Sequence, residues 1–354
     1  MIDLDDEREL AARDPGGMLA TIASLPDQCR EGYSLGRGVV GLPRFEDVTA
    51  VVVCGMGGSA VAGDVLRALY ADRSRIPMQV VRGAGLPGFC GPNTLVLASS
   101  YSGDTAETIG CFEEALRRGC RVVVVTSGGT LAARAAELAL PCVVVPLGHM
   151  PRAALGYLLM SSIGALEVAG LVPPVTEDLD EAVAELEGLV PTLVPSAPTS
   201  VNPAKRVAAA IGSRVPLVWG AEGFGAVAAA RWKTQFNENA KVPAFASTLP
   251  ELDHNEVVGW SSGRGRRFFL VVLRHDAEPP EVAARFAPSV EIATASGVVA
   301  QEVWAGGESA LAKLLSLVVT GDFATAYLGL ARGEDPTPID AIARLKQSLA
   351  GPER

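Results

Sequence analysis

The chain has little of what would mark an exported, nucleic-acid-binding or membrane-spanning protein. Its formal net charge of -10 at pH 7 opposes binding to a polyanion, so we expect neither nucleic acid nor a membrane among its partners. The first ten residues, MIDLDDEREL, are acidic and lack the basic and then apolar order of a signal peptide. The most membrane-like segment, Ala153–Val172, contains Glu167 and has no basic flank behind it, which favours a buried helix.

The cysteines also lack the patterns that would indicate a disulfide scaffold or a metal site. The chain has six cysteines, and they form no CxxC pair and no Cys/His ligand spacing. Two of them, Cys54 and Cys142, lie inside valine-rich runs and are expected in the core. The cysteines therefore predict reduced thiols and a cytoplasmic location.

Short apolar runs alternate with helical patterns through the first half of the chain. The short runs lack a period of two, which is typical of strands covered on both faces of a parallel sheet. The sequence therefore predicts a doubly wound α/β unit. Its strands are expected at Ala50–Cys54, Met78–Val81, Thr94–Ala98, Arg121–Thr126 and Cys142–Val145, and its helices at Ala60–Tyr70, Thr105–Arg118 and Leu131–Leu138.

The second half repeats this alternation in kind. With 354 residues the chain exceeds the size that one hydrophobic core usually supports. We predict two doubly wound domains with mostly parallel sheets flanked by helices and with sheet edges facing a shared cleft: residues 1–170, a linker with an acidic helical insert over 171–202, and residues 203–354. The second domain is expected to have strands at Val215–Trp219, Arg267–Leu273 and Val290–Thr294, and helices at Pro203–Gly212, Gly225–Asn237, Ser309–Leu330 and Ile339–Leu349.

A glycine-rich turn follows the first predicted strand and opens a helix. Gly57 and Gly58 let backbone amides approach an anion, the helix dipole favours negative charge there, and Ser59 adds a hydroxyl. The turn also fits the dinucleotide pattern GxGxxA. Because the second strand ends near Arg82 and not near an acidic residue, an NADP-dependent oxidoreductase remains an alternative.

A hydroxyl-rich turn, SSYSGDT at residues 99–105, follows the third predicted strand and opens another helix. Its side chains Ser100, Ser102 and Thr105 can each donate to a separate phosphate oxygen. Two such turns at the same sheet edge suit one phosphomonoester better than a dinucleotide. They therefore predict a phosphate-binding site.

Polar residues concentrate between Trp232 and Trp260. Glu238 lies between two asparagines, and His254 lies within the run ELDHNE. Glutamate and histidine together can move protons near neutral pH, so this stretch is a candidate catalytic segment. A solvated loop, with Glu238 facing Lys241 at a helix end, is the alternative.

These segments resemble known sugar phosphate isomerases. The two turns look like the phosphate site of the sugar isomerase (SIS) domain. NENAK at residues 237–241 and ELDHNEVVGW at residues 251–260 resemble the bifunctional phosphoglucose/phosphomannose isomerase family. Further matches that extend the resemblance over nearly the whole chain are PRAALGY at residues 151–157, DPGGM at residues 14–18 and DPTPI followed by LK at residues 335–346.

The resemblance implies an aldose–ketose isomerase that interconverts glucose 6-phosphate and/or mannose 6-phosphate with fructose 6-phosphate, without a metal or other cofactor. Glu238 would be the base that moves a proton between C2 and C1 through a cis-enediolate, and Arg152 would stabilise that enediolate. His254 would help to open the sugar ring and would come from the partner subunit of a homodimer. Lys346 would contact the ring oxygen or a hydroxyl, and Thr337 is a weaker candidate.

A regulator from another functional class would share part of this pattern. A non-catalytic SIS module that binds a sugar phosphate would keep the two turns, but it has no need of Glu238 and His254. Their presence favours the enzyme. Acceptance of both C2 epimers would depend on the space that the pocket leaves for rotation about C2–C3.

Overall fold

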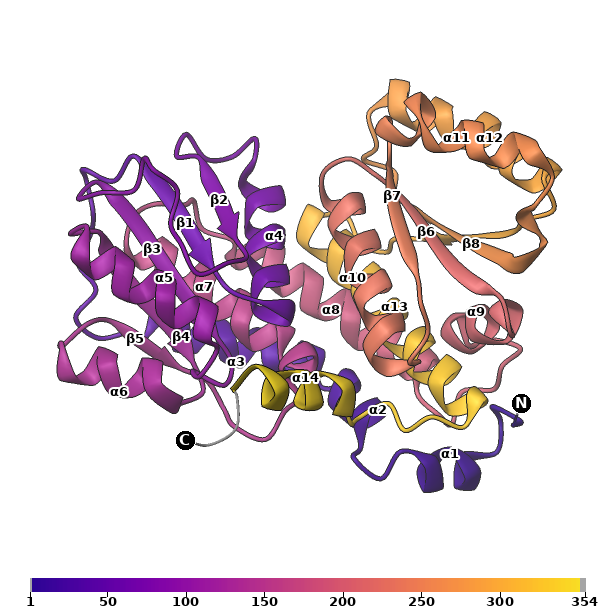
Figure 1. Ribbon diagram of the computed structural model, residues 1–354, viewed down its shortest axis with the longest axis horizontal. Helices are drawn as coiled ribbons and strands as arrows, with labels where there is room; N and C mark the ends of the chain where they lie inside the picture. The colour runs from indigo at the N-terminus through magenta and orange to yellow at the C-terminus, as the bar shows by residue number, and fades with distance from the viewer. Residues whose placement is uncertain (1, 351–354) are drawn as a thin grey trace.

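The computed structural model describes residues 2–350. It contains two parallel sheets flanked by helices, one with the strand order β2-β1-β3-β4-β5 and one with the order β7-β6-β8-β9 (Figure 1). The α/β class predicted from the sequence, with two parallel sheets, is confirmed. The strands are β1 (Ala50–Cys54), β2 (Met78–Val81), β3 (Thr94–Ser100), β4 (Arg121–Thr126), β5 (Cys142–Val144), β6 (Val215–Ala221), β7 (Phe245–Leu249), β8 (Phe268–Arg274) and β9 (Val299–Trp304).

The first half has the doubly wound strand order that its alternating pattern predicts. Every residue of β1 and β3 is buried, which explains why these strands are apolar on both faces. The helices of this half are α1 (Glu7–Arg13), α2 (Met18–Ala23), α3 (Leu25–Arg37), α4 (Gly57–Tyr70), α5 (Ala106–Arg117), α6 (Gly129–Glu137) and α7 (Leu155–Val168), with the short 3-10 helix η1 (Pro151–Ala153) before α7.

The second sheet has the same order as the first four strands of the first sheet, although one predicted strand is wrong. Residues Val290–Thr294 lie in α12, where Val282, Phe286, Ser289 and Ala293 are buried at helical spacing. The helices of this half are α8 (Thr176–Leu193), α9 (Pro203–Ile211), α10 (Phe224–Asn239), α11 (Glu256–Gly259), α12 (Pro280–Ala295), α13 (Ala310–Arg332) and α14 (Asp340–Ala350), with 3-10 helices η2 (Glu251–His254), η3 (Trp260–Ser262) and η4 (Gly265–Arg267).

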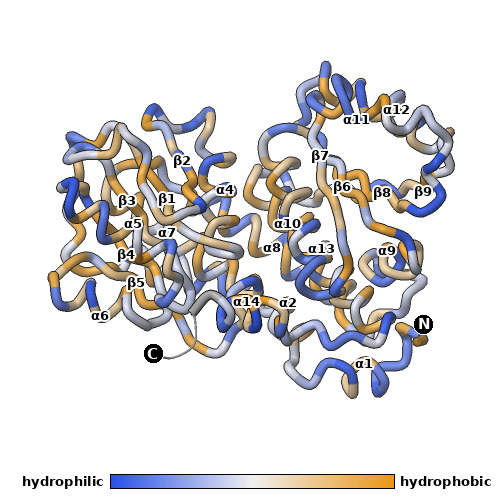
Figure 2. The backbone as a smooth tube through the Cα atoms, in the orientation of Figure 1, coloured by the Kyte–Doolittle hydropathy of each residue, from blue (hydrophilic) through white to orange (hydrophobic). Residues whose placement is uncertain are grey.

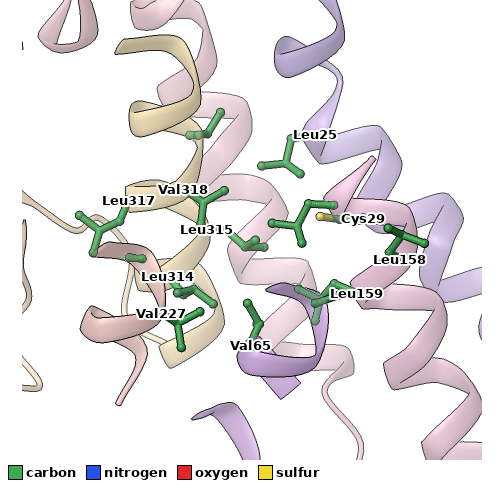
Figure 3. Packing of buried hydrophobic residues seen from close by; sticks show 14 of the residues in the cluster. Leu25, Cys29, Val65, Leu158, Leu159, Val227, Leu314, Leu315, Leu317 and Val318 are labelled. Carbon is green, nitrogen blue, oxygen red and sulfur yellow. The ribbon is translucent and has the colours of Figure 1, made fainter. Parts of the chain in front are cut away.

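One continuous hydrophobic core joins the two halves. Figure 2 shows apolar residues along β1, β3, β6 and β8, and Figure 3 shows Val65 of α4, Leu159 of α7, Val227 of α10 and Leu315 of α13 gathered in one cluster among the helices. Helix α8, inside the predicted linker, packs along α13 and α3. The boundaries at residues 171 and 202 stay a prediction.

Helix α13 is long and apolar enough to cross a membrane by length and composition alone. The whole of its most apolar window is buried inside the protein, and α8, α9 and α10 pack against it. The apolar character of α13 is therefore that of a helix at the centre of a core.

The region between the two sheets is bordered by the carboxyl edge of the first sheet and by the amino edge of the second. Helix η1 follows β5, at the carboxyl edge of the first sheet, and Arg152 in η1 contacts Asn239 at the end of α10. Because α10 ends just before β7 begins, its last turn lies at the amino edge of the second sheet. The carboxyl edge of the second sheet carries η2 and α11 at the top of Figure 1, away from that contact.

Candidate active site

The glycine-rich turn after β1 leads directly into α4. Gly57 has φ +51°, a left-handed conformation that favours glycine, and Gly58 lies so close to η1 that a Cβ on it would come within 2.7 Å of the carbonyl oxygen of Pro151. Ser59 is 4% exposed, and its Oγ accepts a hydrogen bond from the amide of Tyr101 at 3.3 Å. Since Ser59 accepts there, its own hydroxyl hydrogen remains available to a ligand.

The hydroxyl-rich turn after β3 lies beside this glycine turn, because β1 and β3 are neighbours in the sheet. Ser100 Oγ and Thr105 Oγ1 are hydrogen-bonded at 2.9 Å, and the amide of Gly103 donates to Ser100 Oγ at 3.2 Å. Ser102 is exposed. The structure therefore brings the predicted phosphate ligands Gly57, Gly58, Ser59, Ser100, Ser102 and Thr105 to one edge of the first sheet.

Asp104 is the one carboxylate within the hydroxyl-rich turn. It accepts hydrogen bonds from the amide and from the hydroxyl of Thr130, at 2.9 and 2.8 Å, and these bonds hold the pKa of Asp104 below its ordinary value. The carboxylate of Asp104 is thus bound to the first turn of α6. The hydroxyls of Ser100 and Thr105 remain as the neutral polar side chains of the hydroxyl-rich turn.

Arg152 is 2% exposed, and most of its donors are occupied. Its Nε donates to Oδ1 of Asn239 at 2.8 Å, and its Nη2 donates to the carbonyl oxygens of Pro336 and Thr337 at 2.5 and 2.9 Å. Nη1 is buried and makes no hydrogen bond within the described chain. Burial lowers the pKa of the Arg152 guanidinium, and the carboxylates of Glu238 and Asp322 act in the opposite direction.

Glu238 lies in the last turn of α10 and faces that free donor. Its Oε2 is 3.6 Å from Nη1 of Arg152, and its side chain is 25% exposed. Glu238 also lines a cavity of about 500 Å³ between the end of α10 and the start of α14. A carboxylate that is partly exposed and next to one unsatisfied cationic donor has the arrangement of a base paired with an electrophile.

Lys241 does not pair with the carboxylate of Glu238 as the solvated alternative requires. It has φ +57°, and its Nζ donates to the main-chain oxygens of Glu238 and Pro336 at 2.6 and 3.2 Å. Burial lowers the pKa of Lys241, and the charge of Arg152 lowers it further. Lys241 and Arg152 thus hold the same carbonyl group of Pro336, and they attach the segment after α13 to the end of α10.

The C-terminal candidates lie at different distances from this centre. The main-chain oxygen of Thr337 is bonded to Arg152, and its side chain packs on Gly16, where a Cβ would come within 2.3 Å of Oγ1. Lys346 is exposed on α14 and makes no hydrogen bond or ion pair within residues 2–350. Thr337 is therefore next to the site, whereas the structure places no contact on the amine of Lys346.

His254 is not brought to Glu238 within one subunit. It is exposed in η2, which follows β7, whereas Glu238 precedes β7. The five residues of β7 separate the two ends of the strand by roughly 17 Å at about 3.3 Å per residue. The two halves of the polar stretch thus lie at opposite edges of the second sheet.

Several buried polar residues around Arg152 were not predicted from the sequence. Asn239, Arg231 and Asp322 are each no more than 5% exposed, and together they surround the main chain and guanidinium of Arg152. One signal was available: Asp322 is the only acidic residue in the long apolar run of α13. An isolated carboxylate in a buried helix predicts a partner, although not which one.

Comparison with known proteins shows the family to which the sequence is similar. Residues 200–349 match the family model described as the bacterial phospho-glucose isomerase C-terminal SIS domain. The chain is 35% identical to the bifunctional phosphoglucose/phosphomannose isomerase of Caldicellulosiruptor bescii, over 94% of this chain and 99% of that protein. It is 34% identical to the enzyme of the same description from Aquifex aeolicus, over 90% of this chain and 98% of that protein.

Solved structures share the fold at lower sequence identity. A hypothetical protein of Thermus thermophilus superposes with a TM-score of 0.73 at 20% identity, covering 98% of this chain and 94% of that one. The two curated relatives match over almost their whole lengths, so the likeness includes both sheets and the segment between them. The chain belongs to the bifunctional phosphoglucose/phosphomannose isomerase family.

Proposed function

We propose that the protein interconverts glucose 6-phosphate and/or mannose 6-phosphate with fructose 6-phosphate through a cis-enediolate, with Glu238 as the base. The observation that carries the proposal is the ion pair of Glu238 Oε2 with Nη1 of Arg152 at 3.6 Å, since Nη1 makes no hydrogen bond within residues 2–350. An aldose–ketose isomerase needs one carboxylate that reaches two adjacent carbons and a cation where the enediolate charge develops.

The phosphate would bind between the turns that open α4 and α5. The hydroxyl of Ser59, the Ser100–Thr105 pair and the amides of both turns supply donors without a formal charge. The contact between Gly58 and η1 supports a site in which the phosphate and Arg152 are close neighbours. Phosphate binding would then hold the reacting end of the open-chain sugar between Arg152 and Glu238.

The proton balance is simple. Glu238 removes the proton from C2 of the aldose and returns it to C1, while one proton passes from the C2 hydroxyl to the C1 oxygen. The negative charge of the intermediate lies on the C1 and C2 oxygens. Nη1 of Arg152 can stabilise that charge because its other donors are already occupied.

Ring opening is assigned to His254 of a second subunit in a homodimer. Its exposure on η2 and its position at the far edge of the second sheet support this assignment, since an exposed imidazole is free to enter another subunit's site. Lys346 would approach the ring oxygen or a hydroxyl from α14, with Thr337 beside Arg152.

An NADP-dependent oxidoreductase fits the geometry less well. Arg82, the residue offered for a 2′-phosphate, is paired with Asp64. The glycine-rich turn is also covered by η1, because Gly58 lies against Pro151 and Arg152. That contact leaves less of the turn open to the two phosphates of a dinucleotide than to the single phosphate proposed above.

The test is a coupled assay that offers glucose 6-phosphate and mannose 6-phosphate separately and detects fructose 6-phosphate. Glu238→Gln should retain sugar phosphate binding and lose about 10²–10⁴-fold in kcat, as expected when a general base is removed. Glu334→Gln is the matched control, because Glu334 lines the same cavity without contacting Arg152. Full turnover by Glu238→Gln would exclude the proposed mechanism, and a regulator of the SIS class would bind both sugars and convert neither.

A further inference from the structure

The guanidinium of Arg152 is held so that one nitrogen, Nη1, faces Glu238 Oε2 at 3.6 Å without a hydrogen bond in the described part of the chain. Nε and Nη2 make three hydrogen bonds, whereas Nη1, although buried, makes none to residues 2–350. A buried N–H group without a partner is unfavourable by about 1–3 kcal/mol, so most such groups in proteins are satisfied. The surrounding residues must therefore prevent Arg152 from turning Nη1 toward another acceptor.

Asn239 fixes one side of the guanidinium. It is 0% exposed, and its Oδ1 accepts from Nε of Arg152 at 2.8 Å. The other end of the amide is anchored as well, because its Nδ2 donates to Oγ1 of Thr325 at 3.0 Å. The Thr325 hydroxyl donates to the main-chain oxygen of Asp322, so its own oxygen can only accept from Asn239. These bonds leave the amide of Asn239 a single orientation, with its oxygen toward Arg152.

A buried ion pair fixes the main chain of Arg152. Nη2 of Arg231 donates to the carbonyl oxygen of Arg152 at 2.8 Å and to Oδ2 of Asp322 at 2.5 Å, and Nε of Arg231 donates to Oδ1 of Asp322 at 3.0 Å. Burial raises the pKa of Asp322, and Arg231 opposes that shift. Arg152 is thus held at its backbone by Arg231 and at its side chain by Asn239.

The neutral charge of residue 239 is also significant. Aspartate could accept the same hydrogen bond from Nε, but it would neutralise Arg152 and add a second negative charge beside Glu238. Asparagine supplies the acceptor while leaving the full charge of Arg152 to a developing anion.

We propose that Asn239 is a positioning residue for the isomerisation: its amide locks Arg152 so that Nη1 is the one donor presented to the enediolate. The inference rests on the proposed function, since it specifies how the electrophile of that reaction is oriented. Asn239 does not touch the substrate in this account, and its effect is transmitted through Arg152 alone.

Two substitutions separate orientation from charge. Asn239→Leu removes the acceptor, and kcat should fall about 10- to 100-fold while KM changes less than about threefold, because the phosphate turns are untouched. Asn239→Asp keeps the acceptor but should move the acidic limb of the kcat–pH profile to higher pH, since a second carboxylate raises the pKa of the base. Asn202→Leu is the matched control. Asn202 is another fully buried asparagine, which caps α9 away from the site, so its loss should lower stability but not kcat.

A double-mutant cycle tests whether Asn239 acts through Arg152. Arg152→Met combined with Asn239→Leu should be no slower than Arg152→Met alone, whereas independent effects would multiply. Multiplying losses, or an unchanged kcat–pH profile in Asn239→Asp, would overturn the proposal.

The proposed function can fail separately. If the wild-type protein converts no hexose 6-phosphate, a crystal structure of Asn239→Leu decides the positioning role. The proposal requires the Arg152 guanidinium to rotate or shift in that structure, and an unmoved Arg152 would refute it.

Discussion

Replacing Arg152 by lysine tests whether the geometry of this cation matters beyond its charge. A lysine ammonium cannot stand at the positions of both Nε and Nη2, so Oδ1 of Asn239 or the carbonyl oxygen of Thr337 loses its donor, whereas the Pro336 oxygen still accepts from Lys241. One buried acceptor left unpaired costs about 1–3 kcal/mol, which is the expected loss in the free energy of unfolding. At about 2–4 °C per kcal/mol, the Tm should fall by roughly 2–12 °C.

The same substitution should affect catalysis in a specific way. Because the Nη1 donor is lost while the phosphate turns remain, kcat should fall about 100-fold and KM for glucose 6-phosphate should change little. Arg332→Lys is the matched control. Arg332 also donates from Nε and Nη2 to main-chain oxygens, of Gly212 and Arg214, but it lies outside the site, so it should lower Tm without lowering kcat. A raised KM with normal kcat in Arg152→Lys would show that Arg152 binds substrate and transition state equally, and would refute the assignment.

Two further predictions concern the subunit contact and the pH dependence of stability. If His254 serves the neighbouring subunit, mixing the inactive variants Glu238→Gln and His254→Ala should restore about a quarter of wild-type activity. Half of the randomly mixed dimers then contain both variants, and each of these has one intact site out of two. No recovery of activity would place both residues in one subunit's site. Burial holds the pKa of Lys241 below its ordinary value of 10.5. The unfolded chain therefore binds more protons than the folded chain at pH values just below 10.5, and the free energy of unfolding should rise with pH in that range. Thermal melts from about pH 8 upward should show this rise in the wild type and a smaller one in Lys241→Met.

The first half of the fold follows from its sequence because its strands are buried on both faces. Runs such as residues 50–54 are apolar throughout, and glycine or hydroxyl turns mark where the helices begin. The edge strand β7, FASTL, was missed because it is short and largely solvent-facing, so it has no apolar run. The strand predicted at Val290–Thr294 is wrong for the opposite reason, because this part of α12 contains β-branched residues, which are common in strands.

The residues of the candidate site also form two groups, those that a local pattern indicates and those whose positions depend on long-range packing. Residues in sequence motifs, such as Ser59 and Glu238, could be proposed from local pattern and family resemblance. Asn239 and Asp322 act through contacts between α10, α13 and η1, and their positions depend on packing over long sequence separations. No local pattern specifies such contacts, and for this reason the contact of Lys241 with the Pro336 oxygen was not predicted either.

The close approach of Gly58 to η1 has a consequence for the size of the substrate. A Cβ on Gly58 would lie 2.7 Å from the carbonyl oxygen of Pro151 and 3.1 Å from Cα of Arg152, so the backbone of the glycine-rich turn packs directly on the backbone of η1. Together they would fix the distance between a bound phosphate and the guanidinium of Arg152. With the phosphate bound as proposed, Arg152 would reach only the carbons that lie a set number of bonds from it. A pentose 5-phosphate, one carbon shorter, would leave its carbonyl group short of Glu238, so chain length would be discriminated by the backbone and without any side chain that recognises the missing carbon.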